Sequence, residues 1–210
     1  MLLLLLNNQS GFIILGNKLM LADLITSKTR TKLLNLFLDN PPEMLHVREV
    51  VRRVNEEINS VRRELIYLEK KGILKREPRV NRVYYYLDKI YPFYFDLLNI
   101  NAKTKGIGED IIKNRVKLGR IKFAMLSGKF ARGTRENPEA VDLLMVGTIV
   151  VPELSVLVRQ EEARRKHEIN YTVMTEEEFN FRKKRLDPFI TSIIHGLRIM
   201  LIGDEEQLLA

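Results

Sequence analysis

The 210-residue chain contains no cysteine and no tryptophan, and it has only three histidines. Without cysteine, disulfide bonds, thiolate metal sites and a cysteine nucleophile are all excluded. The histidines, His46, His167 and His195, are scattered and show no metal-ligand spacing. No apolar run approaches the roughly 18 residues that would span a bilayer, and the N-terminal apolar residues lack the basic flank of a signal peptide. We therefore expect a cytoplasmic protein without a membrane segment.

Positive charge is concentrated in one part of the chain. Lys and Arg number 35 against 27 Asp and Glu, which gives a formal net charge of +8. Residues 27–87 hold 14 of these cations and eight of the acids, a net +6, whereas the other 149 residues are nearly balanced. With 45% apolar and 30% charged residues, the composition is that of a globular chain. The basic segment favours a polyanionic partner.

Residues 1–19 contain two apolar runs, Met1–Leu6 and Phe12–Leu15, around a polar turn that ends at Gly11. This pattern is consistent with a β-hairpin. Alternatively, the segment is an upstream extension, and the working domain starts near Met20.

The segment from residue 27 to 87 predicts three helices followed by a β-hairpin. Apolar residues recur at helical spacing in the first part, and two short strand-like runs then flank a Pro/Asn turn. Ser27 can cap the first helix, and Gly72 can end the third. The helices are expected at 29–38, 46–54 and 59–71, and the strands at 73–77 and 82–87. This order is typical of a winged helix-turn-helix domain.

One side of the third predicted helix is apolar, and the opposite side carries groups that can contact DNA. A helix in the major groove can place such side chains against base edges and phosphates, and basic residues on the hairpin can reach the backbone or the minor groove. The predicted DNA-contacting residues are Asn59, Ser60, Arg62, Arg63 and Tyr67 on the helix and Arg76, Arg79 and Arg82 on the hairpin. The alternative interpretation is an ordinary solvated face, as many charged stretches are.

The stretches VREV, NSVRREL, LEKKGILK and NRVYYYL carry a resemblance to a known family. They resemble the winged helix of arsenic-repressor-type transcriptional regulators, especially the versions that are fused to a minimal nucleotidyltransferase domain. The resemblance implies that helix 59–71 enters the major groove of double-stranded DNA. It also implies a homodimer on a two-fold operator.

Strands alternate with helices in the rest of the chain, which favours an α/β or α+β sheet domain there. Strands are expected at 121–126, 142–146, 169–174 and 198–202, with a helix at 153–167 and further helices capped by Thr175 and Asp187. We therefore expect an α+β chain of two domains. The boundaries are an extension at 1–19, a winged helix domain at 20–100, a linker at 101–108 and a sheet domain at 109–210.

The stretch LSGKFARGTRENPEAVDLLMVGT places Gly128, Gly133 and Asp142 in an order that resembles the nucleotidyltransferase superfamily. That superfamily uses an Asp-x-Asp pair to hold two divalent ions. The corresponding triplet here is Ala140-Val141-Asp142, so one of the two metal ligands is missing. Lys129 replaces the serine of the family's glycine turn, and Asn170 lies where a third acid is expected. We therefore expect no catalysis and no required cofactor, with a nucleotide or Mg²⁺ at the degenerate site as the alternative.

The surviving turn leaves several roles open. Gly128, Lys129, Arg132, Gly133 and Asp142 could still hold a nucleotide phosphate, because backbone amides and cations suffice for anion binding. If the turn still binds a nucleotide, the domain is a nucleotide-sensing pseudoenzyme. The simpler alternative is that the fold is kept for dimerisation. The hypothesis from another class is an active magnesium-dependent nucleotidyltransferase that modifies a protein or RNA. Our main expectation is a sequence-specific DNA-binding regulator, with a nucleotide as a possible effector.

Overall fold

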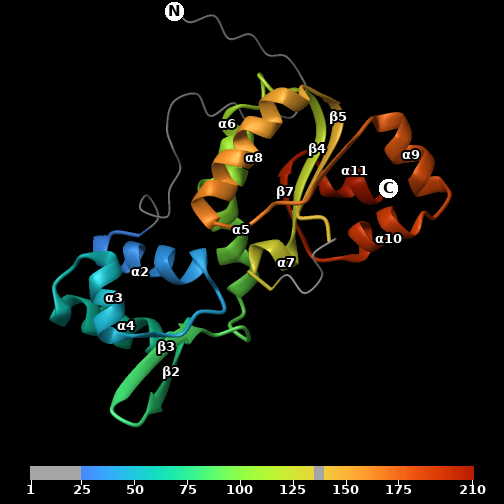
Figure 1. Cartoon of the computed structure of the whole chain (residues 1–210). Coiled ribbons are helices and arrows are strands. Elements are labelled where there is room, and N and C mark those ends of the chain that lie inside the picture. The colour runs from blue at the N-terminus through green and yellow to red at the C-terminus, as the bar shows by residue number, and fades with distance from the viewer. Residues whose placement is uncertain (1–24, 135–139) are drawn as a thin grey trace, which may run out of the picture.

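The computed structural model describes residues 25–134 and 140–210. The hairpin proposed for residues 1–19 lies outside this part. Within the described residues the chain is a mixture of helices with one three-stranded and one four-stranded sheet. Figure 1 shows how these elements are arranged. The predicted α+β class is confirmed at that level.

The first three helices and the hairpin occur where the sequence predicts them. They are α2 (Lys28–Asp39), α3 (Val47–Val54), α4 (Ile58–Lys70), β2 (Leu74–Arg79) and β3 (Arg82–Leu87). A short strand, β1 (Leu45–His46), was not predicted; it pairs with β3 and completes an antiparallel sheet of order β1-β3-β2. His46 therefore belongs to this strand and caps α3 rather than starting it. Two residues are too few to show strand alternation in a sequence.

The ends of the first and third helices follow from specific side chains and one glycine. The Ser27 hydroxyl accepts the Arg30 N–H at 3.3 Å, as expected of an N-cap. Helix α4 starts at Ile58 because the carboxylate of Glu57 accepts the Ser60 N–H at 2.8 Å; the predicted start at residue 59 or 60 was slightly late. Gly72 has φ +76° just beyond α4, a conformation that favours glycine.

Residues 94–113 are almost entirely helical. They form α5 (Tyr94–Thr104) and α6 (Gly106–Lys113), so the proposed linker at 101–108 falls within two helices. The sequence concealed α5 because its buried positions include Asn101 and Thr104 beside Leu98. The helices divide at Gly106, whose φ is +61° and where a Cβ atom would lie 2.6 Å from the Glu161 carboxylate.

The second sheet contains β4 (Gly119–Ser127), β5 (Leu143–Ile149), β6 (Tyr171–Met174) and β7 (Arg198–Ile202) in the order β6-β5-β4-β7. Only the β5–β6 pair is parallel within this sheet. The connecting helices are α7 (Gly128–Ala131), α8 (Val151–Arg165), α9 (Glu176–Lys184), α10 (Pro188–His195) and α11 (Glu205–Leu209). The predicted caps are confirmed: Thr175 accepts the Glu178 N–H at 3.1 Å, and Asp187 accepts the Phe189 N–H at 2.9 Å.

Alternate residues of β4 supply two separate cores. Phe123 and Met125 pack on the side of α9, α10 and α11, whereas Ala124 and Leu126 belong to the larger core on the side of α6 and α8 (Figure 1). The larger core continues without a break into the N-terminal helices, where it includes Leu33. No helix in the described part of the chain is both long and apolar enough to cross a membrane.

Candidate nucleic-acid interface

Helix α4 presents a polar face on the side away from its buried residues. Asn59, Arg62 and Arg63 are exposed, and Ser60 is half-buried. The Ser60 hydroxyl lies 3.3 Å from that of Thr29, so it already has one partner. Among residues 25–134 and 140–210, neither Arg62 nor Arg63 forms an ion pair. After the backbone N–H groups of Asn59 and Ser60, the two guanidinium charges also lower the pKa of Glu57, so this carboxylate is a nearby charge that a ligand would compete with.

Tyr67 lies on the same face, but one side of its ring is covered. The Arg30 guanidinium of α2 is 3.8 Å from the ring centroid, and the Lys71 ammonium is 5.7 Å away. Such contacts stabilise a cation above an aromatic face. Tyr67 is 38% exposed, so it offers its remaining surface rather than an open stacking platform.

Arg30 is held over Tyr67 by a buried carboxylate that the sequence reading missed. Glu64 of α4 is 7% exposed and accepts hydrogen bonds from Ser27 Oγ and Arg30 Nε, both at 2.8 Å. These bonds join the start of α2 to the middle of α4. A signal was present in the sequence, because Glu64 falls within the apolar side defined by Val61 and Leu65, where a charge needs a partner.

The β2–β3 hairpin projects away from the rest of the molecule beside α4 (Figure 1). Arg76 and Arg79 are exposed but paired, Arg76 with Glu69 at 2.9 Å and Arg79 with Glu77 at 2.6 Å. For Arg82 no ion pair is present in the described part of the chain. Arg79 and Arg82 are directly opposite each other next to the turn, and like charges in such a position destabilise a hairpin. Glu77 already neutralises Arg79, whereas Arg82 has no such partner among the described residues.

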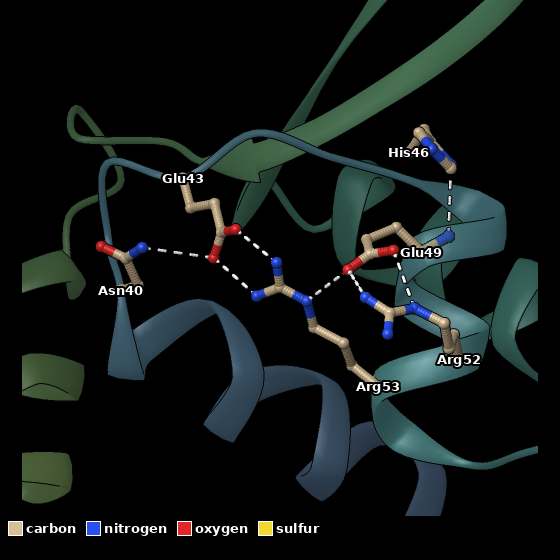
Figure 2. Close-up of polar contacts among 6 residues, drawn as sticks. All are labelled: Asn40, Glu43, His46, Glu49, Arg52 and Arg53. Atoms are coloured by element: carbon tan, nitrogen blue, oxygen red, sulfur yellow. Dashed lines mark hydrogen bonds and ion pairs between the residues drawn. The ribbon is translucent and has the colours of Figure 1, made fainter. Parts of the chain in front are cut away.

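A network of ion pairs fixes α3 to the loop that precedes it, as Figure 2 shows. Arg53 contacts Glu43 at 2.6 Å and Glu49 at 2.7 Å, and Glu49 also pairs with Arg52. Hydrogen bonds from Arg52, and next from Arg53, lower the pKa of Glu49 to about 2. His46 caps the helix by accepting the Glu49 N–H at 3.2 Å. Arg52 and Arg53 are therefore already paired, in contrast to Arg62 and Arg63 on α4.

The glycine turn of the predicted nucleotide site is engaged mainly within the protein. The Gly128 N–H donates to the Leu197 carbonyl at 2.6 Å, and a Cβ atom at Gly128 would lie 2.7 Å from Leu197 Cβ. The Gly133 N–H donates to the Phe130 carbonyl, and the Phe130 N–H donates to Ser127 Oγ. This close approach to Leu197 is sufficient reason for glycine at position 128.

Three of the predicted nucleotide-site residues lie together. Lys129, Arg132 and Asp142 line a cavity of about 480 Å³ that Arg198 also lines. Asp142 is 1% exposed, and its Oδ2 accepts the Asn170 N–H at 3.0 Å, so this carboxylate already has a structural partner.

Gly133 is not part of this cavity. It has φ +61°, and a Cβ atom there would lie 3.4 Å from Pro42 Cδ, which places it towards the N-terminal elements. Ala140 lines the cavity but supplies no carboxylate. Across residues 25–134 and 140–210, no three His, Asp or Glu side chains come together as a potential metal site.

Comparisons with known proteins add little to this geometry. No family model and no curated protein matches the chain. The solved structure of reduced HlyU from Vibrio cholerae N16961 is similar over 37% of this chain and 77% of that chain. Its sequence identity is 21% and the TM-score is 0.30, and at that level the similarity supports no conclusion about fold or function.

Proposed function

We propose that the protein is a sequence-specific regulator of transcription that binds double-stranded DNA through a winged helix-turn-helix unit. Helix α4 would lie in the major groove, and the β2–β3 hairpin would act as the wing. The observation that carries this proposal is the exposed face of α4, where Arg62 and Arg63 are free of ion pairs with the described residues.

The packing of α4 suits this role. Val61, Leu65 and Leu68 are fully buried, so the 13-residue helix is fixed against the core while its opposite face remains exposed. A major groove admits a helix, and arginine can donate two hydrogen bonds to a guanine edge. The two opposed arginines near the hairpin tip would contact phosphates, and a phosphate would neutralise Arg82 as Glu77 already neutralises Arg79.

We further propose a homodimer, because a two-fold protein matches a two-fold operator and doubles the contact area. The second sheet would then be a nucleotidyltransferase-like domain that serves dimerisation or nucleotide sensing. The cationic cavity lined by Lys129 and Arg132 supports the sensing role, since cations can hold a phosphate without a metal ion. We assign no magnesium ion or other cofactor.

The test is binding of the full chain to duplex DNA from upstream of its own gene and to random duplex DNA across a salt series. Specific binding should persist at salt concentrations that release random DNA, because contacts to the backbone alone weaken steeply with salt. Arg63→Ala should cost about 1–3 kcal/mol if Arg63 contacts a base. The matched control is Arg159→Ala, which removes an exposed charge from α8. Equal, salt-sensitive binding to both duplexes would refute specific recognition.

We propose that the chain does not transfer nucleotides, because Ala140 cannot supply the second metal ligand and Asp142 is already bound to Asn170. The competing hypothesis, an active enzyme acting on a protein or RNA, predicts magnesium-dependent incorporation of a labelled nucleotide. Such incorporation, if abolished by Asp142→Ala, would establish the enzyme and overturn this part of the proposal.

A further inference from the structure

A second cavity, of about 540 Å³, lies where the C-terminal end of α2 meets α5, α6, α7 and α8. It is separate from the cavity near Asp142 and from the exposed face of α4. Apolar side chains such as Leu98, Ile107 and Phe130 form part of its wall. Its volume is within the range of sites that bind small molecules, which combine apolar walls with a few polar groups.

Asn101 is a polar group in this wall that lacks a full set of partners. Its residue is 9% exposed, and its Nδ2 donates to the carbonyl of Leu38 and to Asp39 Oδ1, both at 3.3 Å. Both partners are acceptors, so the orientation of the amide is fixed. The Oδ1 atom is then buried without a hydrogen-bond partner among the described residues. A buried acceptor of this kind is costly unless a donor reaches it.

Cationic groups lie around the same cavity. Lys105 pairs with Asp39 at 2.7 Å, and Arg164 and Arg165 both pair with Glu161 at 2.7 Å. Arg165 uses its Nε for that bond and lies over the Phe130 ring at 4.4 Å. Within residues 25–134 and 140–210 its terminal nitrogens have no acceptor, and a guanidinium has several N–H donors in one plane. A carboxylate is one of the groups that match those donors.

We propose that this cavity binds a small organic monoanion. The carboxylate would accept hydrogen bonds from Arg165 and be attracted by Lys105, and an apolar body would contact Phe130. A hydroxyl or amine of the ligand would donate to Asn101 Oδ1 after a small shift of the wall, because this atom has almost no accessible surface in the empty cavity. This site uses none of the residues assigned to DNA or to a nucleotide, apart from Gly133 at its rim.

The ligand would influence DNA binding through α2, and this step rests on the proposed function. Leu38 and Asp39, at one end of α2, line the cavity. Near the other end of the same helix, Arg30 contacts Glu64 and Tyr67 of α4. A ligand that prefers one position of α2 therefore also selects a position of α4, and coupling of this kind typically changes affinity by about fivefold or more.

The binding test uses 6-hydroxy-2-naphthoate, a flat apolar monoanion with a hydroxyl donor, titrated into the full chain by calorimetry. Saturable binding with a Kd below about 1 mM is expected. Arg165→Ala, which removes the carboxylate partner, and Ala102→Leu, which fills part of the cavity, should each weaken it about tenfold or more. Arg159→Ala, an exposed charge on the same helix outside the cavity, should leave it unchanged.

Several results would overturn the site. One is the absence of saturable binding of the probe to the folded wild-type protein. Another is binding of the probe to the Arg165→Ala and Ala102→Leu variants with the same affinity as to the wild type. Equally tight binding of neutral 2-naphthol would also overturn the requirement for an anion. Thermal unfolding of each variant confirms that it is folded before its affinity is compared.

A second titration, of duplex DNA with and without the probe, separates this inference from the proposed function. A shift of about fivefold or more in DNA affinity supports coupling through α2. Unchanged DNA affinity at saturating probe refutes the coupling. Binding of the probe by a protein that binds no DNA under either condition refutes the DNA-binding function and supports the site itself.

Discussion

Replacing Glu64 by glutamine tests how α4 is held. The substitution keeps the shape of the side chain but removes the charge that receives Ser27 Oγ and Arg30 Nε at 2.8 Å. It also leaves an amide NH₂ facing one of these donors. Because Glu64 lies in a face that is otherwise apolar, neither neighbour can be rearranged without moving α2 relative to α4.

The expected loss is about 2 kcal/mol in the free energy of unfolding. A hydrogen bond to a charged group contributes about 1.5–3 kcal/mol, and the Glu64 side chain is only 9% exposed, so water cannot replace it. The Arg30 side chain is 26% exposed and can be partly rehydrated, which holds the estimate to the lower half of that range. For a chain of this length, about 2 kcal/mol lowers Tm by about 4–8 °C.

The assay is urea unfolding followed by circular dichroism, together with thermal melting. The matched control is Glu178→Gln on α9, where the carboxylate pairs with Arg182 at 2.6 Å but is 43% exposed. An exposed pair of this kind contributes about 0.5 kcal/mol or less. In a double-mutant cycle with Arg30→Met, the two substitutions should show a coupling energy of about 1 kcal/mol or more.

Equal stability of the Glu64→Gln and Glu178→Gln variants would refute this reasoning. That result would mean that the desolvation cost of the Arg30–Glu64 pair cancels its attraction, as happens for some buried ion pairs. The position of α4 would then depend on its apolar residues alone.

Three further predictions follow from local contacts. The pKa of Glu49 is about 2 in the folded protein against 4.5 for the unperturbed group. The stability that this carboxylate contributes is therefore present above pH 4.5 and is lost as the pH falls towards 2. Glu49→Gln should reduce the dependence of stability on pH in this acid range, and an unchanged dependence would contradict this. Gly128→Ala should lower the free energy of unfolding in urea by about 1–3 kcal/mol, because the added Cβ would lie 2.7 Å from Leu197 Cβ. A variant as stable as the wild type would show that the backbone at residue 128 can shift freely. Thr175→Ala should cost about 1 kcal/mol in the same assay by removing the cap of α9, and a loss below about 0.3 kcal/mol would mean that this helix end is not limiting.

Much of the fold could be predicted because its helices are amphipathic and have clear end signals. Helix α2 has the Ser27 cap and a regular apolar side, and Gly72 ends α4 with a left-handed φ. Helix α5 was missed because the polar residues Asn101 and Thr104 occupy buried positions. Asn101 is buried against a hydrogen-bond partner more than 60 residues away in the sequence, and no local sequence pattern encodes such a contact.

The exposed face of α4 could also be predicted, since helical periodicity alone separates Arg62 and Arg63 from the apolar side. The pairing of the other arginines could not. Arg76 meets Glu69 only because the hairpin folds back beside the end of α4, and Arg30 reaches Tyr67 only after α2 and α4 have packed together. Sequence spacing gives the direction of a side chain on its own element, whereas pairing between elements depends on tertiary structure.

The continuous core limits how a ligand or a second site could act on the elements that we propose to bind DNA. Leu38 of α2 and Leu98 of α5 are 2% and 1% exposed and belong to one cluster that also contains Ile199 of the second sheet. Swinging the N-terminal elements away would expose both leucines, at about 1.5–3 kcal/mol each. A shift of α2 along its packed neighbours would avoid most of that cost while still moving Arg30, which is paired with Glu64 of α4. The proposed coupling would therefore consist of small displacements of α2, and the cavity that Leu38 and Asp39 line is the place where a ligand would act on that helix directly.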